Sequence, residues 1–225
     1  MRKRFIITSL FAVIALTMAA QDKLILVDSE SREAWLKKNR QVGMFDREKA
    51  RLLIPTKAEF GVECIPSFSP EWALTYDSAA HALVCKKAEK SIWYSTYDAM
   101  YKKKSKTKNG RKIAKRVLRK KPKDYVAPEV KTYSLAITPD QLQMLQAIWK
   151  SAVGTAEDGI DNTLDGIKWE YFIDGKRAKT KKDKNKLVIF TNDLQKAVMT
   201  GDSNLKDSLI NNEFQRVVSE LDIAP

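Results

Sequence analysis

The chain is 225 residues long, 44% hydrophobic, and carries a formal net charge of +13 at pH 7. Its five Trp, seven Tyr and eight Phe are ample material for a core, which excludes disorder over the whole chain. Thirteen Lys and Arg, and no acid, lie between Lys102 and Lys123, and three more basic residues lie at positions 2–4. The remainder is mildly acidic, so the sequence is not that of a uniformly basic protein.

The first twenty residues have the pattern of a secretory signal peptide. Basic residues at 2–4 precede an apolar stretch at 5–18, and Ala19 and Ala20 offer small side chains for a processing peptidase. An uncleaved membrane anchor is the alternative. At about 1.5 Å per residue, however, the sixteen residues 5–20 reach roughly 24 Å, short of the roughly 30 Å hydrocarbon core. We therefore expect an exported protein, periplasmic or extracellular, with a signal peptide at about 1–20.

Two helices are expected early in the mature chain. Residues 28–40 have helical spacing, and Asp28 or Ser29 can cap this helix. Gly43 is expected to interrupt the helical pattern, and residues 45–53 then form a second short helix.

Strands are expected where apolar and polar residues alternate or where short apolar runs occur. These segments are residues 24–27, 59–68, 72–76, 82–85, 92–94, 130–137, 167–173 and 187–190. Asp174 and Gly175 are typical of a hairpin turn, and residues 176–186 are expected to be a loop or an exposed strand. The strands between residues 59 and 94 are expected to form an antiparallel meander.

The clearest helix signal in the mature chain begins at Thr138. Thr138 can cap, Pro139 occupies the first helical position, and Gln141 completes a capping box for a helix that Gly154 ends. Two further helices are expected at about 191–201 and 203–221. The pattern predicts an α+β fold: one domain at 21–225, with a basic insertion at about 102–123, in which helices pack on one face of an antiparallel or mixed sheet.

Cys64 and Cys85 are the two cysteines of the chain. In an oxidising compartment a single pair is a candidate disulfide, and two separate buried thiols are the alternative. A metal site is not expected, because two cysteines and a single histidine fall short of the usual zinc ligand set.

The basic insertion is the strongest candidate for a binding site. Dense lysine without interleaved aromatic residues is a poor match to nucleic-acid binding, and an exported protein meets anions of the cell envelope first. A solvated loop without a ligand is the alternative. The residues expected to contact an anionic partner are Lys102, Lys103, Lys104, Lys106, Lys108, Arg111, Lys112, Lys115, Arg116, Arg119, Lys120 and Lys121. Anionic lipid headgroups, lipopolysaccharide and acidic glycans are the expected partners.

Catalytic patterns are weak. His81 lies three residues after Ser78, but this spacing within one turn does not give triad geometry. The segment from Asp161 to Gly166 resembles a calcium loop, yet its twelfth position is Phe172 instead of a bidentate Glu. No catalytic residue and no cofactor is therefore assigned.

Paired carboxylates could flank a glycosidic bond, as in an envelope or glycan hydrolase. Glu63 with Glu71, and Asp165 with Glu170, are two such pairs, although any chain with 28 acids offers many. Trp72, Trp93 and Trp169, which lie in strand-like segments, are expected in the core and not stacked on sugars.

Three segments resemble parts of small exported proteins of the Bacteroidetes: Gln21 after the signal junction, residues 65–72, and residues 164–172. This resemblance implies a periplasmic or surface setting. The group has no established activity, so it supplies no functional residue. We expect a non-catalytic exported interaction protein; an envelope hydrolase and a structural envelope protein are the alternatives.

Overall fold

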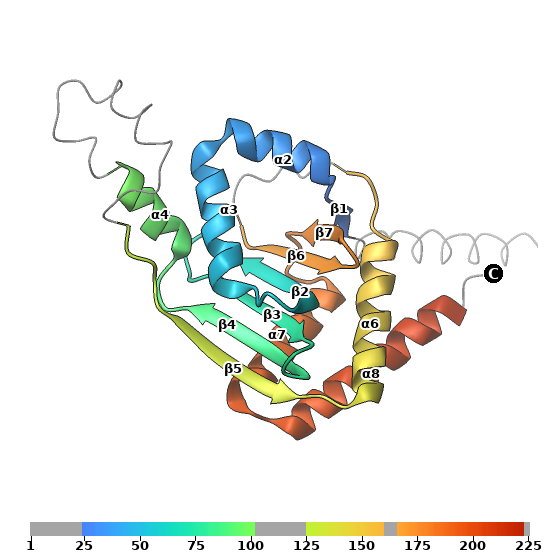
Figure 1. Cartoon of the computed structure of the whole chain (residues 1–225). Helices are drawn as coiled ribbons and strands as arrows, with labels where there is room; N and C mark the ends of the chain where they lie inside the picture. The colour runs from blue at the N-terminus through green and yellow to red at the C-terminus, as the bar shows by residue number, and fades with distance from the viewer. Residues whose placement is uncertain (1–23, 102–124, 160–165, 223–225) are drawn as a thin grey trace, which may run out of the picture.

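The structure is a computed structural model, and it describes residues 24–101, 125–159 and 166–222. In this part of the chain, seven strands form one antiparallel sheet in the order β1-β7-β6-β2-β3-β4-β5 (Figure 1). The strands are β1 (Ile25–Leu26), β2 (Ala58–Ile65), β3 (Trp72–Asp77), β4 (Ala82–Ala88), β5 (Val130–Ala136), β6 (Lys168–Ile173) and β7 (Lys176–Thr180). The expected meander is confirmed for β2, β3 and β4 but not for residues 92–94, which are helical.

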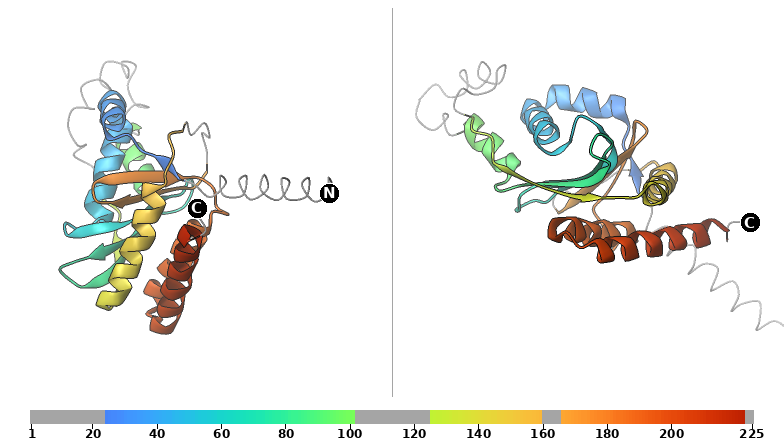
Figure 2. Two further views of the ribbon diagram at one scale, coloured as in Figure 1. Left: turned by 90° about the vertical axis from the view of Figure 1, so that its right-hand side faces the viewer. Right: turned by 60° about the horizontal axis from the view of Figure 1, so that its bottom comes forward.

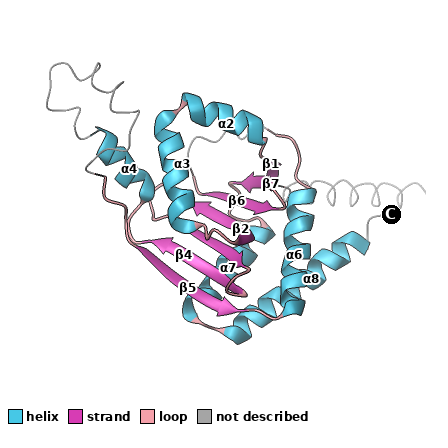
Figure 3. Ribbon diagram, in the orientation of Figure 1, coloured by secondary structure: helices cyan, strands magenta, loops and turns pink. Residues whose placement is uncertain are grey.

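Helices cover both faces of this sheet. They are α2 (Ser29–Lys38), α3 (Arg40–Leu53), α4 (Ile92–Tyr101), α6 (Pro139–Gly154), α7 (Lys186–Thr200) and α8 (Ser203–Asp222). Helices α7 and α8 lie on one side of the sheet and α2 and α3 on the other (Figures 2 and 3). The α+β class is confirmed. The expectation that helices pack on one face only was wrong, because β2, β3 and β6 carry side chains that need cover on both faces.

The face towards α6, α7 and α8 holds the main apolar core. Trp149 of α6 is fully buried there, between Phe60 of β2, Tyr171 of β6 and Phe190 of α7. Its indole nitrogen donates to the backbone oxygen of Gly61, 2.8 Å away. A side chain at Gly61 would meet the backbone of β3, so only glycine allows β2 and β3 to lie this close together at this position.

The first two helices meet at Asn39. Asp28 caps α2 by accepting from the backbone nitrogens of Glu30 and Ser31, as expected. Helix α3 begins at Arg40 and runs through Gly43, so the expected break at that glycine was wrong. The amphipathic sequence of α3 buries Phe45 and Leu53 against the sheet, and this burial outweighs the roughly 1 kcal/mol helix cost of one glycine.

Residues 92–94, expected as a strand, begin helix α4 instead. The cause is remote in the sequence. Glu71, at the start of β3 and fully buried, accepts hydrogen bonds from the backbone nitrogens of Ile92 and Trp93 and from the hydroxyl of Ser91. A carboxylate from a neighbouring segment thus caps this helix together with the local Ser91, whose hydroxyl accepts from the backbone nitrogen of Tyr94.

Residues 187–190, also expected as a strand, form the first turns of α7. Asn185 caps this helix by accepting from the backbone nitrogens of Leu187 and Val188. A short apolar run does not distinguish a strand from a buried helix. The capping box at Thr138 and the hairpin turn at Asp174 and Gly175 are both confirmed.

Cys64 and Cys85 are free and buried, so the expected disulfide was wrong. Cys64 pairs with Trp72, and Cys85 pairs with Leu74, so β3 separates the two cysteine-bearing strands. Alternate strands lie roughly 10 Å apart, whereas a disulfide requires Cα atoms within about 7 Å. Burial raises the pKa of both thiols to about 12.

Candidate functional site

The face of the sheet beneath α2 and α3 carries buried charged residues beside a smaller apolar cluster that includes Phe45 and Leu53 of α3. Glu63 of β2 and Glu170 of β6 lie directly opposite each other in the antiparallel pair, and each is only 1% exposed. Both alternate with apolar neighbours along their strands, so the opposite face of the same strands stays in the main core. Two like charges directly opposite each other destabilise a sheet unless cations neutralise them.

Four cations surround the two glutamates. Lys49 of α3, fully buried, makes an ion pair with Glu63. Arg177 of β7 lies between the two carboxylates, 3.1 Å from Glu63 Oε1 and 2.9 Å from Glu170 Oε1. Arg32 of α2 reaches the same Glu170 oxygen at 2.5 Å.

The fourth cation, Lys168, and a third acid, Asp46, complete this ion cluster. Lys168 lies 3.0 Å from Glu170 Oε2 on the same strand. Asp46 of α3 lies 2.8 Å from Arg32 and 3.7 Å from Lys49. We call the set the buried ion cluster; its members are Arg32, Asp46, Lys49, Glu63, Lys168, Glu170 and Arg177.

The cluster fixes the protonation of Glu170. Burial alone would raise the pKa of this carboxyl, but the charges of Lys168, Lys49 and the two arginines outweigh burial and hold it far below its usual range. Desolvation acts the other way on the ammonium group and lowers the pKa of Lys49 to about 8, against the attraction of Glu170 and Asp46.

This electrostatic state decides what the paired carboxylates can do. A glycosidase of the two-carboxylate type needs one carboxyl that keeps a proton near neutral pH. Glu170 is ionised, and both of its oxygens already contact cations. The ion pairs of Glu63 and Glu170 are therefore suited to holding α2, α3 and β7 together, and Glu170 is not suited to general acid catalysis.

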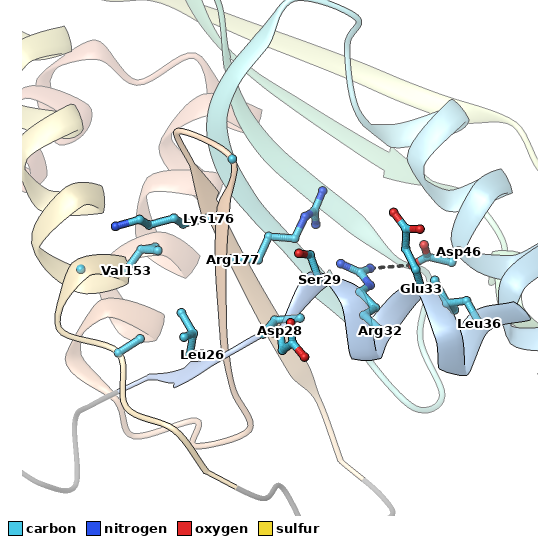
Figure 4. A pocket seen from close by; sticks show the side chains of 14 residues that line it. Leu26, Asp28, Ser29, Arg32, Glu33, Leu36, Asp46, Val153, Lys176 and Arg177 are labelled. Carbon is cyan, nitrogen blue, oxygen red and sulfur yellow. Dashed lines mark hydrogen bonds and ion pairs between the residues drawn. The ribbon is translucent and has the colours of Figure 1, made fainter.

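An open groove of about 610 Å³ lies beside the ion cluster. The start of α2, the turn between β6 and β7 and the end of α6 surround it (Figure 4). Arg32, Asp46 and Arg177 belong to both the cluster and the groove wall. The groove is the site where the ion cluster meets solvent.

The basic insertion lies outside the described residues, so the structure places none of its twelve expected contact residues. Most of the calcium-like loop is also outside them. Among the described residues, no group of three or more His, Cys, Asp or Glu could hold a metal ion. No helix in the same part of the chain is long and apolar enough to cross a membrane.

His81 is exposed in the turn between β3 and β4, with a positive φ of 48°. Its Nδ1 lies 3.5 Å from the hydroxyl of Tyr76. Glu71 caps α4 and does not pair with Glu63. In the sheet, Glu63 lies opposite Ala73 of β3 and Glu170 of β6. Trp72 and Trp169 are buried in the main core, as expected.

The sequence singled out Glu63 and Glu170, but each with a different partner. A sequence signal that could have predicted their pairing is the presence of an acid in the middle of each of two otherwise apolar strands. Lys49, Arg32 and Arg177 were missed, because a charged residue on a helix or a hairpin gives no local sign that it will be buried.

No protein-family model matches the chain, and no curated protein or solved structure is significantly similar to it.

Proposed function

We propose that this protein is an exported, non-catalytic binding protein whose basic insertion, Lys102 to Lys123, contacts an anionic partner at the cell envelope. The observation that carries the proposal is the distribution of charge. The described residues contain equal numbers of basic and acidic residues, so the net positive charge of the chain comes from outside them. The basic insertion supplies most of that excess.

A folded platform flanks the insertion on both sides. Helix α4 precedes it, and the capping contacts of Glu71 fix the start of that helix. Strand β5 follows it and pairs along its whole length with β4. The elements on either side of the insertion, α4 and β5, therefore belong to the folded part of the chain. The described residues carry no net charge, so they do not oppose the field of the thirteen cations of the insertion.

The test compares two variants with the same net charge. The first replaces six lysines of the insertion with Gln: Lys102, Lys103, Lys104, Lys106, Lys108 and Lys112. The control replaces six exposed lysines of the platform with Gln: Lys37, Lys57, Lys90, Lys150, Lys184 and Lys196. Binding of the mature protein is measured to phosphatidylglycerol vesicles, phosphatidylcholine vesicles, lipopolysaccharide and polygalacturonate, at low and at high ionic strength.

We expect the wild type and the control to bind at least one anionic probe, with affinity that falls steeply as salt is raised. The insertion variant should lose most of that binding, and phosphatidylcholine should bind none of the three proteins. The pattern of probes that bind separates lipid headgroups from acidic glycans. Equal loss in both variants, or no binding by the wild type, contradicts the proposal and favours a structural role.

In the alternative of an envelope hydrolase, Glu170 is not available as the general acid, because it is ionised in the buried ion cluster. We therefore place binding ahead of hydrolysis.

A further inference from the structure

The two edges of the sheet end in different ways. At one edge, β1 is only two residues long and Glu157 covers it. The backbone oxygen of Glu157 accepts from the nitrogen of Leu26 at 2.9 Å, and its nitrogen donates to the oxygen of Leu24 at 3.0 Å. At the other edge, β5 is seven residues long, and no strand among the described residues lies beyond it (Figure 1). The β5 edge is therefore the open one.

The pairing of β5 with β4 shows which backbone groups face this open edge. One residue before β5 begins, the nitrogen of Glu89 donates to the backbone oxygen of Glu129 at 2.9 Å. Because bonded and non-bonded pairs alternate along an antiparallel ladder, the odd-numbered residues of β5 direct their backbone groups to β4. The residues that direct theirs to the open edge are Val130, Thr132 and Ser134.

Little protects this edge against a further strand. Strand β5 contains no proline, and its pairing with β4 runs along its whole length without a shift in register. Its one charged side chain, Lys131, already pairs with Glu89 at 2.9 Å. Thr132 and Ser134 are exposed, and no described residue outside β4 bonds their backbone groups. Prolines, bulges and unpaired charges are the usual guards of an exposed edge, so β5 is suited to pairing with another strand.

A second copy of β5 complements this edge. With a two-fold axis at Thr132, Thr132 pairs with itself and Val130 pairs with Ser134, and both partners of each pair exchange backbone hydrogen bonds. Lys131 then lies opposite Tyr133 of the other copy, so no like charges face each other. The exposed threonines form a cross-strand pair of a kind that stabilises sheets.

Neighbouring registers fit less well. An axis at Lys131 places two lysines directly opposite each other, which destabilises a strand pair. An axis at Tyr133 pairs Val130 with Ala136, whose backbone oxygen already accepts from Lys206 at 2.9 Å. The register centred on Thr132 avoids both conflicts.

We propose that β5 joins two copies of this chain into a dimer by antiparallel pairing centred on Thr132, so that one sheet continues through both copies. The interface is isologous, because the same edge serves both partners. Two paired strands bury a small area, so the dimer is weak and its population depends on concentration. The inference uses no residue of the basic insertion.

The test places charge at the two-fold axis. Thr132→Glu and Thr132→Lys each put two like charges opposite each other in the dimer, whereas an equimolar mixture of the two variants puts opposite charges there. Thr155→Glu and Thr155→Lys are the controls, because Thr155 is exposed and follows α6 beside the closed edge. Sedimentation velocity of the mature protein, up to high micromolar concentration, measures the dimer fraction, and circular dichroism verifies the fold of each variant.

The wild type and both Thr155 variants should dimerise with the same dissociation constant. Each Thr132 variant alone should raise that constant by at least about tenfold, and the mixture of the two should lower it again. The inference is overturned if the wild type stays monomeric over the whole series, if the Thr132 variants dimerise as the wild type does, or if their mixture associates no better than either variant alone.

Hydrogen exchange tests the register independently. The amides of Val130, Thr132 and Ser134 should gain protection as the concentration of the wild type rises, whereas those of Lys131 and Tyr133, which bond to β4, should be protected at every concentration. Exchange at Thr132 that does not change with concentration would contradict the pairing. The basic insertion is intact in all these proteins, so the outcome is independent of the proposed envelope contact.

Discussion

The two faces of the sheet are stabilised by different kinds of interaction. Along β2, Phe60, Val62 and Cys64 point into an apolar core, while Glu63 points into the buried ion cluster on the other face. Dispersion and the hydrophobic effect hold α6, α7 and α8, and these do not depend on protonation. Ion pairs hold α2, whose described side chains include none that is buried. One face should therefore be insensitive to pH and the other sensitive.

The largest loss of stability is expected from Trp149→Ala. It removes a fully buried side chain and its hydrogen bond to Gly61, so the free energy of unfolding should fall by about 3 to 5 kcal/mol. Urea denaturation followed by circular dichroism measures the change. Trp35→Ala is the control, because Trp35 is 52% exposed and should cost little. A loss as large in the control would mean that α2 packs more firmly than its burial indicates.

Breaking the ion cluster should cost less. Glu170→Gln removes the carboxylate that Arg32, Arg177 and Lys168 share, but Arg32 keeps Asp46 and Arg177 keeps Glu63, so the free energy of unfolding should fall by about 1 to 3 kcal/mol. Urea denaturation again reports the loss. Glu59→Gln, at an exposed position of β2, is the control. An unchanged midpoint for Glu170→Gln would show that the cluster does not hold the charged face together.

The stability contributions of the two faces should differ in their response to acidic pH. The pKa of Glu170 is lowered in the folded state relative to its usual 4.5, so its contribution is complete above that value and is lost as the pH falls below it. The thermal midpoint of the wild type should therefore drop on acidification from about pH 6 to about pH 3. Glu170→Gln should show a shallower drop, whereas Trp149→Ala should keep the wild-type slope. Parallel curves for all three proteins would contradict this assignment.

A smaller effect is expected at the start of α4. Glu71→Ala removes the acceptor for the backbone nitrogens of Ile92 and Trp93, and loss of a helix cap typically costs about 1 to 2 kcal/mol. Chemical denaturation measures the loss, and exchange of the α4 amides shows whether it is local. Protection of these amides at the wild-type level would mean that other contacts define the helix start.

The smallest effect is expected from the thiols. Cys64 and Cys85 are buried and unpaired, and burial raises their pKa to about 12. Both should react with a thiol reagent only after unfolding, and a reducing agent should leave the thermal midpoint unchanged. A midpoint that falls on reduction would indicate that the disulfide suggested by the sequence does form.

The sequence by itself determined the elements whose signals are local. The helix at Thr138, the hairpin at Asp174 and Gly175, and the meander of β2 to β4 follow from capping chemistry, turn geometry and alternation over a few residues. The expected signal peptide and the basic insertion are also inferred from local patterns, and they lead to the proposed envelope contact.

Only the tertiary structure decided the features that depend on distant partners. Helix α4 begins where Glu71 reaches it, and the cysteines stay apart because β3 lies between their strands. Glu63 and Glu170 become neighbours because β6 returns beside β2 after about a hundred residues of chain. Register and strand order place side chains from remote segments together, and no pattern within a short window of sequence contains that information.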